Sequence, residues 1–372
     1  MISSISIQGY RSFDHFEMPD LGRINLLVGT NNSGKTSILE AVSILESSGD
    51  IFRLWNILWK RGERTYKVFP QAASTPPRAV AEADVVHIFH GHELHPGTHF
   101  SISAKNVAPQ KTVKFEIREL GPSEKIDGQI IEEGDEASPL PRLVLDIVST
   151  PSPAPLPSVL LSKTGGISSN NIRARQPQLE RPIQFISTES SSVEEIMGAW
   201  SQISLKPEEQ LVLQALRSLD KDIEAIALQA RTQQQYWGPG SRGGFMVKLK
   251  SSKQPVPIGS MGDGIWRMLA LSMAIALSKG GTLLVDEIDT GLHYTVMSKM
   301  WNLIYTAAKE FDVQVFATTH SYDCVYSLAQ ICPDADPQNK ITVQRIEAGS
   351  AQPIPYDQDE LTVAAAREIE VR

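Results

Sequence analysis

The chain has 372 residues, 41% of them hydrophobic and 21% charged, and its net charge is −8. This balance excludes an intrinsically disordered chain and argues against a uniformly basic nucleic-acid binder. The two cysteines, Cys324 and Cys332, fit no metal or redox spacing and exclude a disulfide scaffold. We see no signal peptide and no apolar stretch that could span a bilayer, so we expect a cytoplasmic protein with no membrane partner.

Residues 29–36 carry the most informative motif. Their sequence, Gly-Thr-Asn-Asn-Ser-Gly-Lys-Thr, fits every fixed position of the phosphate-binding loop G-x-x-x-x-G-K-[ST]. An apolar strand pattern at 24–28 precedes the motif and a helical pattern follows it from Ser37, which argues against a chance match in a glycine-rich loop. Such a loop turns its backbone N–H groups toward phosphate oxygens, and the helix N-terminus adds partial positive charge.

We therefore expect ATP and Mg²⁺ at this loop. Lys35 would reach the β- and γ-phosphates, and the Thr36 hydroxyl would bind the Mg²⁺ ion. The other expected nucleotide-binding residues come from the loop and the start of the helix: Asn31, Asn32, Ser33, Gly34 and Ser37.

The segment 80–150 has a different pattern, because short alternating apolar runs recur between turn-rich pieces. These runs predict an inserted, antiparallel β-rich arm with strands at 84–89, 98–103, 112–117 and 142–148. The following segment, 150–180, opens with alternating prolines, which favour a stiff, extended Pro/Ser-rich loop.

A cluster of five histidines lies within the predicted arm: His87, His90, His92, His95 and His99. Imidazole is a common zinc ligand, so a metal site is one interpretation. No cysteine joins the cluster and its spacing matches no zinc motif, so a polar hairpin turn is the simpler interpretation.

Residues 190–232 carry helical signals and predict a helical lobe. A helix start is expected at Lys206-Pro207-Glu208-Glu209, with proline near the first turn. Apolar residues from Leu211 to Ile226 would form one face of this lobe. The pattern is too short for a coiled-coil arm.

The sequence Ser260-Met261-Gly262-Asp263-Gly264 precedes a strongly apolar helical stretch at 266–277. It repeats the loop-then-helix order of the phosphate loop but lacks a lysine. A glycine-rich helix start can still donate backbone N–H groups to a phosphate. An ordinary glycine turn before a core helix is the alternative.

Two further apolar strand patterns end in polar residues. In residues 282–289 the apolar run leads directly into Asp286 and Glu287, as expected of a buried parallel strand that ends at a ligand crevice. Asp286 would hold Mg²⁺, and Glu287 would polarise the attacking water as a general base; capping of the next helix is the alternative. Residues 314–321 end in Thr-Thr-His-Ser, where His320 could contact a γ-phosphate or belong to a capping turn.

In this order the motifs resemble the ABC-type ATPases of the SMC, Rad50 and RecF kind, and most closely the OLD-like, RecF-related ATPases labelled AAA15 or AAA21. Residues 5–13 are similar to that family's opening strand, which makes Arg11 a candidate for contacting nucleotide or the phosphate loop, against a surface salt bridge. Residues 258–271 are similar to the signature, 286–293 to the Walker B motif and D-loop, and 318–321 to the switch histidine.

The signature departs from the usual ABC pattern, because its serine precedes Met261. Either Ser260 or Gly262 would therefore take the phosphate contact from the opposite subunit, beside Asp263 and Gly264. The Q-loop glutamine cannot be assigned, and Gln184 fits ordinary strand sequence better.

The resemblance implies an α/β fold: a P-loop ABC-type ATPase head with an antiparallel β arm sheet, a helical lobe and no long coiled coil. Residues 1–372 would form a single ATPase domain whose nucleotide-binding core comprises 1–50 and 235–345. ATP would close a head-to-tail homodimer, with each nucleotide between the phosphate loop of one copy and the signature of the other. Higher oligomers are a further expectation.

The function implied is an ATP-hydrolysing switch that controls DNA or a separately encoded nuclease or toxin effector, in anti-phage defence. About fifty residues follow His320, so we expect no Toprim nuclease domain. A RecF-like DNA-repair factor and a P-loop phosphotransferase are the alternatives. Two short basic clusters are simplest as solvated surface: Arg173, Arg175 and Arg181, and Arg242, Lys248, Lys250 and Lys253.

Overall fold

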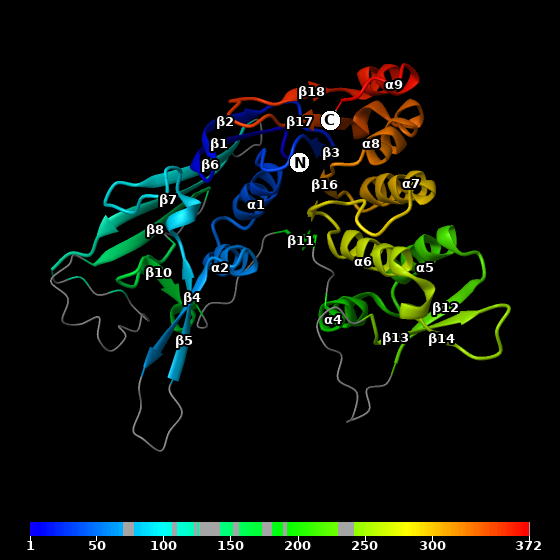
Figure 1. Cartoon of the computed structure of the whole chain (residues 1–372), viewed down its shortest axis with the longest axis horizontal. Coiled ribbons are helices and arrows are strands. Elements are labelled where there is room, and N and C mark those ends of the chain that lie inside the picture. Colours follow the sequence, from blue (N-terminus) through cyan, green and yellow to red (C-terminus); the bar gives the residue numbers. More distant parts are fainter. Residues whose placement is uncertain are drawn as a thin grey trace.

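The computed structural model describes residues 1–69, 78–105, 110–122, 124, 126, 142–151, 156–172, 181–188, 192–229 and 242–371. Within these ranges the chain forms a mixed α/β head, and no helix is long enough for a coiled-coil arm. Figure 1 shows the strands β6–β8 on one side of helix α1 and the helices α5–α7 on the other side. The parallel sheet that carries the functional motifs lies between these two parts.

This core sheet joins strands that are far apart in the sequence, in the order β11-β15-β16-β3-β17-β18. The first five strands are parallel, so their carboxyl ends meet at one edge of the sheet. The strands are β3 (Ile24–Val28), β11 (Ile183–Ile186), β15 (Thr282–Val285), β16 (Gln314–Thr318), β17 (Ile341–Arg345) and the antiparallel β18 (Ile354–Tyr356).

The two faces of the core sheet pack against two separate hydrophobic cores. Along β3, Leu26 belongs to one core and Leu27 to the other. The same alternation occurs at Leu283 and Leu284 of β15. Side chains of a strand point alternately to opposite faces, so a parallel strand covered on both sides needs the unbroken apolar sequence seen here.

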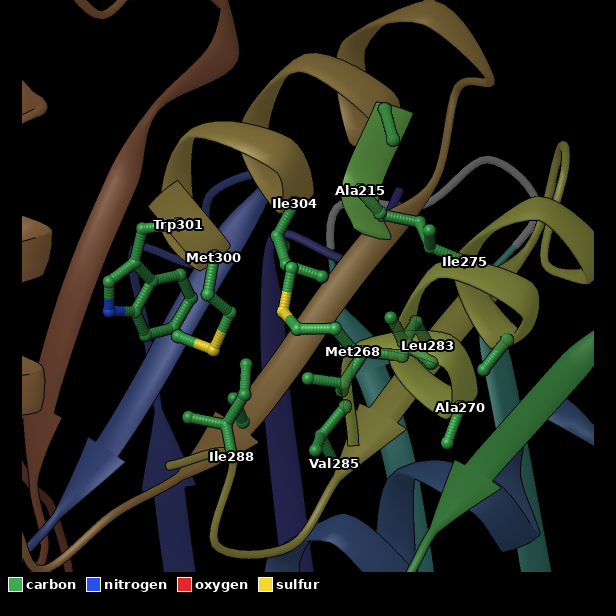
Figure 2. Close-up of a cluster of buried hydrophobic side chains, with 14 of the residues drawn as sticks. Ala215, Met268, Ala270, Ile275, Leu283, Val285, Ile288, Met300, Trp301 and Ile304 are labelled. Carbon is green, nitrogen blue, oxygen red and sulfur yellow. The ribbon is translucent and has the colours of Figure 1, made fainter. Parts of the chain in front are cut away.

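The first core lies under a layer of helices. Figure 2 shows Met268 and Ile275 of α6 meeting Leu283 of β15 and Ile304 of α7. Almost every side chain of α6 from Ile265 to Ala276 is buried, which explains its apolar sequence. The helices of this part are α4 (Val193–Ile203), α5 (Glu208–Leu219), α6 (Asp263–Leu277), α7 (Tyr294–Glu310), α8 (Tyr322–Ala329) and α9 (Gln358–Ala366).

The second core lies between the core sheet, helix α1 (Lys35–Glu46), helix α2 (Ile51–Lys60) and the antiparallel arm sheet. The arm sheet has the order β2-β1-β6-β7-β8-β9. The first two strands of the chain therefore pair with the arm, although they precede the phosphate loop. The arm strands are β1 (Ser4–Tyr10), β2 (Phe13–Met18), β6 (His99–Lys105), β7 (Lys111–Glu119), β8 (Leu143–Thr150) and β9 (Val159–Leu160).

Some local expectations were wrong. Residues 84–89 do not form a strand, because β5 (Arg78–Asp84) ends there and a 3-10 turn, η1 (Val86–Ile88), follows. The described part of the segment expected as a Pro/Ser-rich loop contains β9, β10 (Gly166–Ser168) and α3 (Ser169–Ile172), while residues 152–155 and 173–180 of that segment lie outside the described residues. Strand β10 pairs with β5 in a sheet that β4 (Arg64–Phe69) completes.

The predicted helical face also ends earlier than expected. Helix α5 starts at Glu208, directly after Pro207, which confirms the predicted start. Ile223 and Ile226, however, lie in strand β12 (Ile223–Leu228), which pairs with β13 (Phe245–Leu249) and then β14 (Val256–Pro257). A spacing of three residues fits a helix, but a β-bulge between Ile223 and Ala225 lets both isoleucines face the core from a strand.

Gly281 provides a test of how β11 and β15 meet. A Cβ at Gly281 would lie 1.9 Å from the carbonyl oxygen of Pro182, so Gly281→Ala must push the edge strand away. We expect a loss of about 1–3 kcal/mol of unfolding free energy, measured by urea titration. The control is Gly198→Ala in α4. Among the described residues, a Cβ at Gly198 would have no neighbouring atom within 4 Å, so alanine should raise the unfolding free energy by about 0.5–1 kcal/mol. Equal stability of the two variants would contradict the close approach.

Candidate active site

The predicted phosphate loop connects β3 to α1. Three of its residues adopt positive φ angles, Gly29 (138°), Asn32 (62°) and Gly34 (99°), which curl the backbone at the carboxyl end of β3. Gly34 is the N-cap of α1, and no side chain caps the helix start. The first backbone N–H groups of α1 are therefore available to an anion.

The arm sheet supports this loop from behind. A Cβ at Gly34 would lie 2.4 Å from the ring of Phe13, so the buried aromatic side chain of β2 fits only against glycine. Side chains at the rim of the loop differ in exposure: Asn31 and Asn32 are exposed, and Ser33 is buried.

Lys35 points back into the loop. Its Nζ donates hydrogen bonds to the carbonyl oxygens of Gly29 (2.9 Å) and Thr30 (2.8 Å). Burial lowers the pKa of Lys35, while the negative charges of Asp286 and Glu287 act in the opposite direction. The ammonium is thus held inside the curl of the loop, where phosphate oxygens could replace the two carbonyl groups.

The carboxyl end of β15 brings Asp286 to the phosphate loop. The Thr36 hydroxyl lies 3.1 Å from both carboxylate oxygens of Asp286. The Thr318 hydroxyl, at the end of β16, donates a 2.7 Å hydrogen bond to the same carboxylate. A hydroxyl and a carboxylate oxygen are ligands that Mg²⁺ prefers, so Thr36 and Asp286 fit a Mg²⁺ site.

Glu287 has a strained backbone with φ of 44°, which is uncommon for a residue with a side chain. Its backbone N–H donates to the Thr318 hydroxyl (2.8 Å), which holds the turn in place. The carboxylate is 43% exposed and lies 3.8 Å from His320 Nε2. The predicted general base, Glu287, and His320, the predicted γ-phosphate contact, therefore lie side by side at the open edge of the sheet.

Sequence reasoning missed Thr318 and Arg267. Arg267, on α6, donates from Nη2 to the backbone carbonyls of Asp286 (3.2 Å) and Glu287 (2.8 Å). Burial lowers the pKa of Arg267, and its Nε is buried with no hydrogen-bond partner among the described residues. A single arginine within the apolar run of α6 was the signal available in the sequence.

The predicted signature residues lie at the start of α6. Ser260 donates its hydroxyl hydrogen to the carbonyl of Pro257, and Gly262 adopts a φ of 91° just before the helix. Asp263 forms an ion pair with Arg242. A Cβ on Gly264 would lie 3.7 Å from the carbonyl oxygen of Gly291, so the helix start packs on the loop that follows the Walker B strand.

The structure does not bring this signature to the phosphate loop of the same chain. Among the described residues, none of the four signature positions makes a hydrogen bond or ion pair with residues 29–37. Ser260, Gly262 and Asp263 are exposed.

Arg11 binds two glutamates outside the phosphate loop. Its guanidinium binds Glu40 of α1 (2.9 Å) and Glu63 (2.8 Å), and only 7% of Arg11 is exposed. Its ion pairs are therefore largely buried rather than on the surface, and among the described residues no hydrogen bond joins its side chain to residues 29–36. Ser37 accepts a 3.4 Å hydrogen bond from Arg61, which also binds Glu40.

The histidine cluster of the arm does not gather into one place. The Nδ1 atoms of His87 and His92 lie 3.5 Å apart, and His90 instead contacts the backbone carbonyl of Arg11. The described residues contain no group of three His, Cys, Asp or Glu side chains arranged for a metal ion. In the same part of the chain, no helix combines the length and apolar character of a membrane span.

We predict that Thr318→Val impairs turnover. Valine keeps the shape of threonine but removes the hydroxyl that joins Asp286 to the Glu287 backbone, so kcat for ATP hydrolysis should fall about 10–100-fold. The matched control is Thr342→Val, which removes a buried hydroxyl from β17 that bonds Asn25 (3.0 Å), in the same sheet. Equal kcat values for the two variants would show that Thr318 has no special role.

Comparison with known proteins supports the division of the site between two distant segments. A family described as "AAA ATPase domain" matches residues 1–138, which include the phosphate loop. A family described as "AAA domain, putative AbiEii toxin, Type IV TA system" matches residues 167–323, which include the signature, Asp286 and His320.

One similar protein covers most of the chain and another covers a short part of it. An ATP/GTP phosphatase of Helicobacter pylori is 21% identical in an alignment of 360 residues that covers 90% of each chain. An uncharacterized protein of Methanocaldococcus jannaschii is 38% identical over 55 residues, 15% of this chain and 25% of the other.

Solved structures with a similar course of the chain include two SMC heads. The SMC head domain from Thermotoga maritima has a TM-score of 0.44 at 12% identity, covering 96% of this chain and 98% of the other. An SMC head bound to the C-terminal winged-helix domain of ScpA has a TM-score of 0.48 at 16% identity, with the same coverage. The fold assignment rests on the strand order and site geometry described above.

Proposed function

We propose that this chain is an ABC-type ATPase of the SMC- and RecF-like kind, and that it is a switch in which ATP closes two copies head to tail. Its matches to two AAA-domain families and to an ATP/GTP phosphatase support the ATPase activity. Each nucleotide would lie between the phosphate loop of one copy and the signature at Ser260–Gly264 of the other. Hydrolysis would open the pair again, so the nucleotide would select between two arrangements of the same subunits.

The observation that carries this proposal is the exposed start of α6. Gly262 and Asp263 lie on the surface without a side-chain cap, which leaves backbone N–H groups available to an anion. The neighbouring residues Gly291 and His293, which follow the Walker B strand, are exposed as well. The phosphate loop has an exposed rim of its own, so each copy would offer two complementary half-sites.

Symmetry favours a pair of identical copies. Each chain carries one phosphate loop and one signature, and a two-fold axis would bring each loop to the partner's signature. Two composite sites would form at once. Dimers of this kind could assemble further, although no described surface specifies such an assembly.

The roles proposed for the site follow from the contacts of each residue. Lys35 and the backbone of Asn31–Gly34 would bind the β- and γ-phosphates, while Thr36 and Asp286 would hold Mg²⁺. The ion would neutralise charge on the β- and γ-phosphate oxygens. Glu287 would accept a proton from the water that attacks the γ-phosphorus, and His320 would hydrogen-bond the γ-phosphate, yielding ADP and inorganic phosphate.

We propose that the output of the switch acts on a separately encoded nuclease or toxin effector in an OLD-like anti-phage system. The toxin-related description of the family matching residues 167–323 supports this direction. DNA is the alternative target, as in a RecF-like repair factor. The surface charges favour a protein effector over DNA. Lys248 is paired with Glu224 and Arg242 with Asp263, and the chain carries a net charge of −8. Arg173 and Arg175 lie outside the described residues.

We predict that Glu287→Gln traps the closed pair. Glutamine keeps the shape of the side chain but cannot accept the proton of the attacking water, so ATP should bind without being cleaved. Light scattering should show the dimer mass with ATP and Mg²⁺ and the monomer mass without nucleotide.

The control is the double variant Lys35→Ala/Glu287→Gln, which removes the phosphate-binding cation and should remain monomeric with ATP. Normal turnover by Glu287→Gln would contradict the assignment of the base. A monomer that nevertheless consumes ATP would contradict the head-to-tail pair and favour a phosphotransferase.

A further inference from the structure

A cavity whose wall combines apolar surface with several polar and charged side chains opens beside the expected Mg²⁺ ligands. Its volume is about 240 Å³, and it lies between α1, α2 and the end of β11. Thr36 and Asp286 form one end of it, and Ser187 and Thr188 follow directly after β11. The cavity therefore adjoins the position of the γ-phosphate without being the phosphate loop itself.

The cavity presents polar groups that the active site does not use. Ser43, on the face of α1 that continues from Thr36, is fully buried, and its hydroxyl has no hydrogen-bond partner among the described residues. Asn56 and Lys60 of α2 also line the cavity, and neither side chain makes a hydrogen bond or ion pair within the described part of the chain. A buried polar group without a partner, such as the Ser43 hydroxyl, is uncommon and points to a missing ligand or water, whereas Asn56 is half-buried and Lys60 is exposed at the mouth of the cavity.

The charge of the lining favours an anion. Arg53, Lys60 and Arg61 contribute three cations, against the carboxylates of Glu40 and Asp286. Glu40 is bound by Arg61 (2.6 Å) and by Arg11 (2.9 Å), so the charges of Glu40 and Arg61 largely offset each other. Arg53 and Lys60 remain as cations against the carboxylate of Asp286. Arg53 is half-buried, and its Nη2 donates a long hydrogen bond of 3.4 Å to the carbonyl of Ile183. Burial lowers the pKa of Arg53 while the charge of Asp50 acts in the opposite direction, so an anion in the cavity would stabilise its charged form.

The size of the cavity limits the anion. Pockets for drug-sized ligands are roughly 300–1,000 Å³, so this space is too small for a second nucleotide with its base. A tetrahedral oxyanion can accept hydrogen bonds from a hydroxyl, an amide and two cations at the same time, and charge-assisted bonds of this kind are the strongest in proteins.

We propose that this cavity is a phosphate subsite, which holds inorganic phosphate next to bound ADP. Ser43, Asn56 and Lys60 would donate hydrogen bonds to it, and Arg53 would supply the second positive charge. The inference rests on ATP hydrolysis at the adjoining site and does not require the head-to-tail pair. The phosphate could be the product of hydrolysis or could enter from solution, because the recognition chemistry is the same.

The first experiment measures equilibrium binding of radiolabelled inorganic phosphate to protein saturated with ADP and Mg²⁺. Bound ADP fills the β-phosphate position of the loop but leaves the γ-phosphate position open, so the subsite is identified by the loss of phosphate binding in variants of its own lining residues. We expect Lys60→Ala to weaken phosphate binding about tenfold or more. The matched control is Arg64→Ala, which removes an exposed cation that stacks on Trp59 and does not line the cavity.

A second variant, which changes no charge, distinguishes a lost hydrogen bond from a general effect of charge on phosphate binding. Ser43→Ala removes only the unpaired hydroxyl, and it should also weaken phosphate binding while leaving the affinity for ADP unchanged. Equal phosphate affinities for Lys60→Ala, Arg64→Ala and the unchanged protein would overturn the proposal. Because this measurement involves no ATP cleavage, its result is independent of whether the hydrolytic switch operates as proposed.

The source of the phosphate is resolved by a single turnover of ATP. Cleavage is followed by acid quench, and free phosphate is followed with a fluorescent phosphate sensor. If the subsite receives the product, release lags behind cleavage, and Lys60→Ala shortens the lag several-fold. If the subsite binds phosphate from solution only, no lag exists, but added phosphate slows turnover and Lys60→Ala relieves that inhibition. Neither a lag nor inhibition in the unchanged protein would contradict a phosphate subsite.

Discussion

The active edge of this protein depends on one short chain of hydrogen bonds, from the Thr36 hydroxyl to the Asp286 carboxylate and on to the Thr318 hydroxyl. Thr36 lies 250 positions before Asp286 in the sequence and Thr318 lies 32 positions after it, and the parallel order β15-β16-β3 brings the three together. The Thr318 hydroxyl also accepts a hydrogen bond from the backbone N–H of Glu287. The strand order therefore places the phosphate loop, the metal ligand and the proposed base at one edge. The strained φ angle of Glu287 is maintained by this arrangement.

Helix α6 links that edge to the surface proposed to meet a second copy. Its exposed start carries the signature residues, and one turn later Arg267 binds the carbonyl groups of Asp286 and Glu287. Because the helix is buried along almost its whole length, it can transmit a shift of its start only as a rigid unit. Contact between the signature and a partner's nucleotide would then alter the position of the base in the same subunit. This connection gives a physical route by which two composite sites could act together.

The sequence was sufficient to predict those parts of the structure whose function requires particular residue types within one short segment. The phosphate loop, the apolar strands and the acids after 285 were recognisable because each needs particular residue types at fixed positions. The strand at Ile223 was missed because a β-bulge mimics helical spacing, and the pairing of the first strands with the arm depends on partners about a hundred residues away. Thr318 and Arg267 could not be assigned, since a hydroxyl or a buried cation acquires its role only from neighbours brought in by the fold. The same holds for Arg11, whose partners Glu40 and Glu63 lie on other elements.

Complementation between two inactive variants tests the composite site most directly. Lys35→Ala removes the phosphate-binding cation, and Gly264→Glu places a carboxylate where the partner's γ-phosphate is expected. An acidic residue suits the helix start of its own chain, so this variant should fold. Each variant alone should lack ATPase activity, whereas an equal mixture should regain about a quarter of the normal activity, because half of the pairs are mixed and each contains one intact site. A mixture as inactive as its components would contradict a site built from two copies.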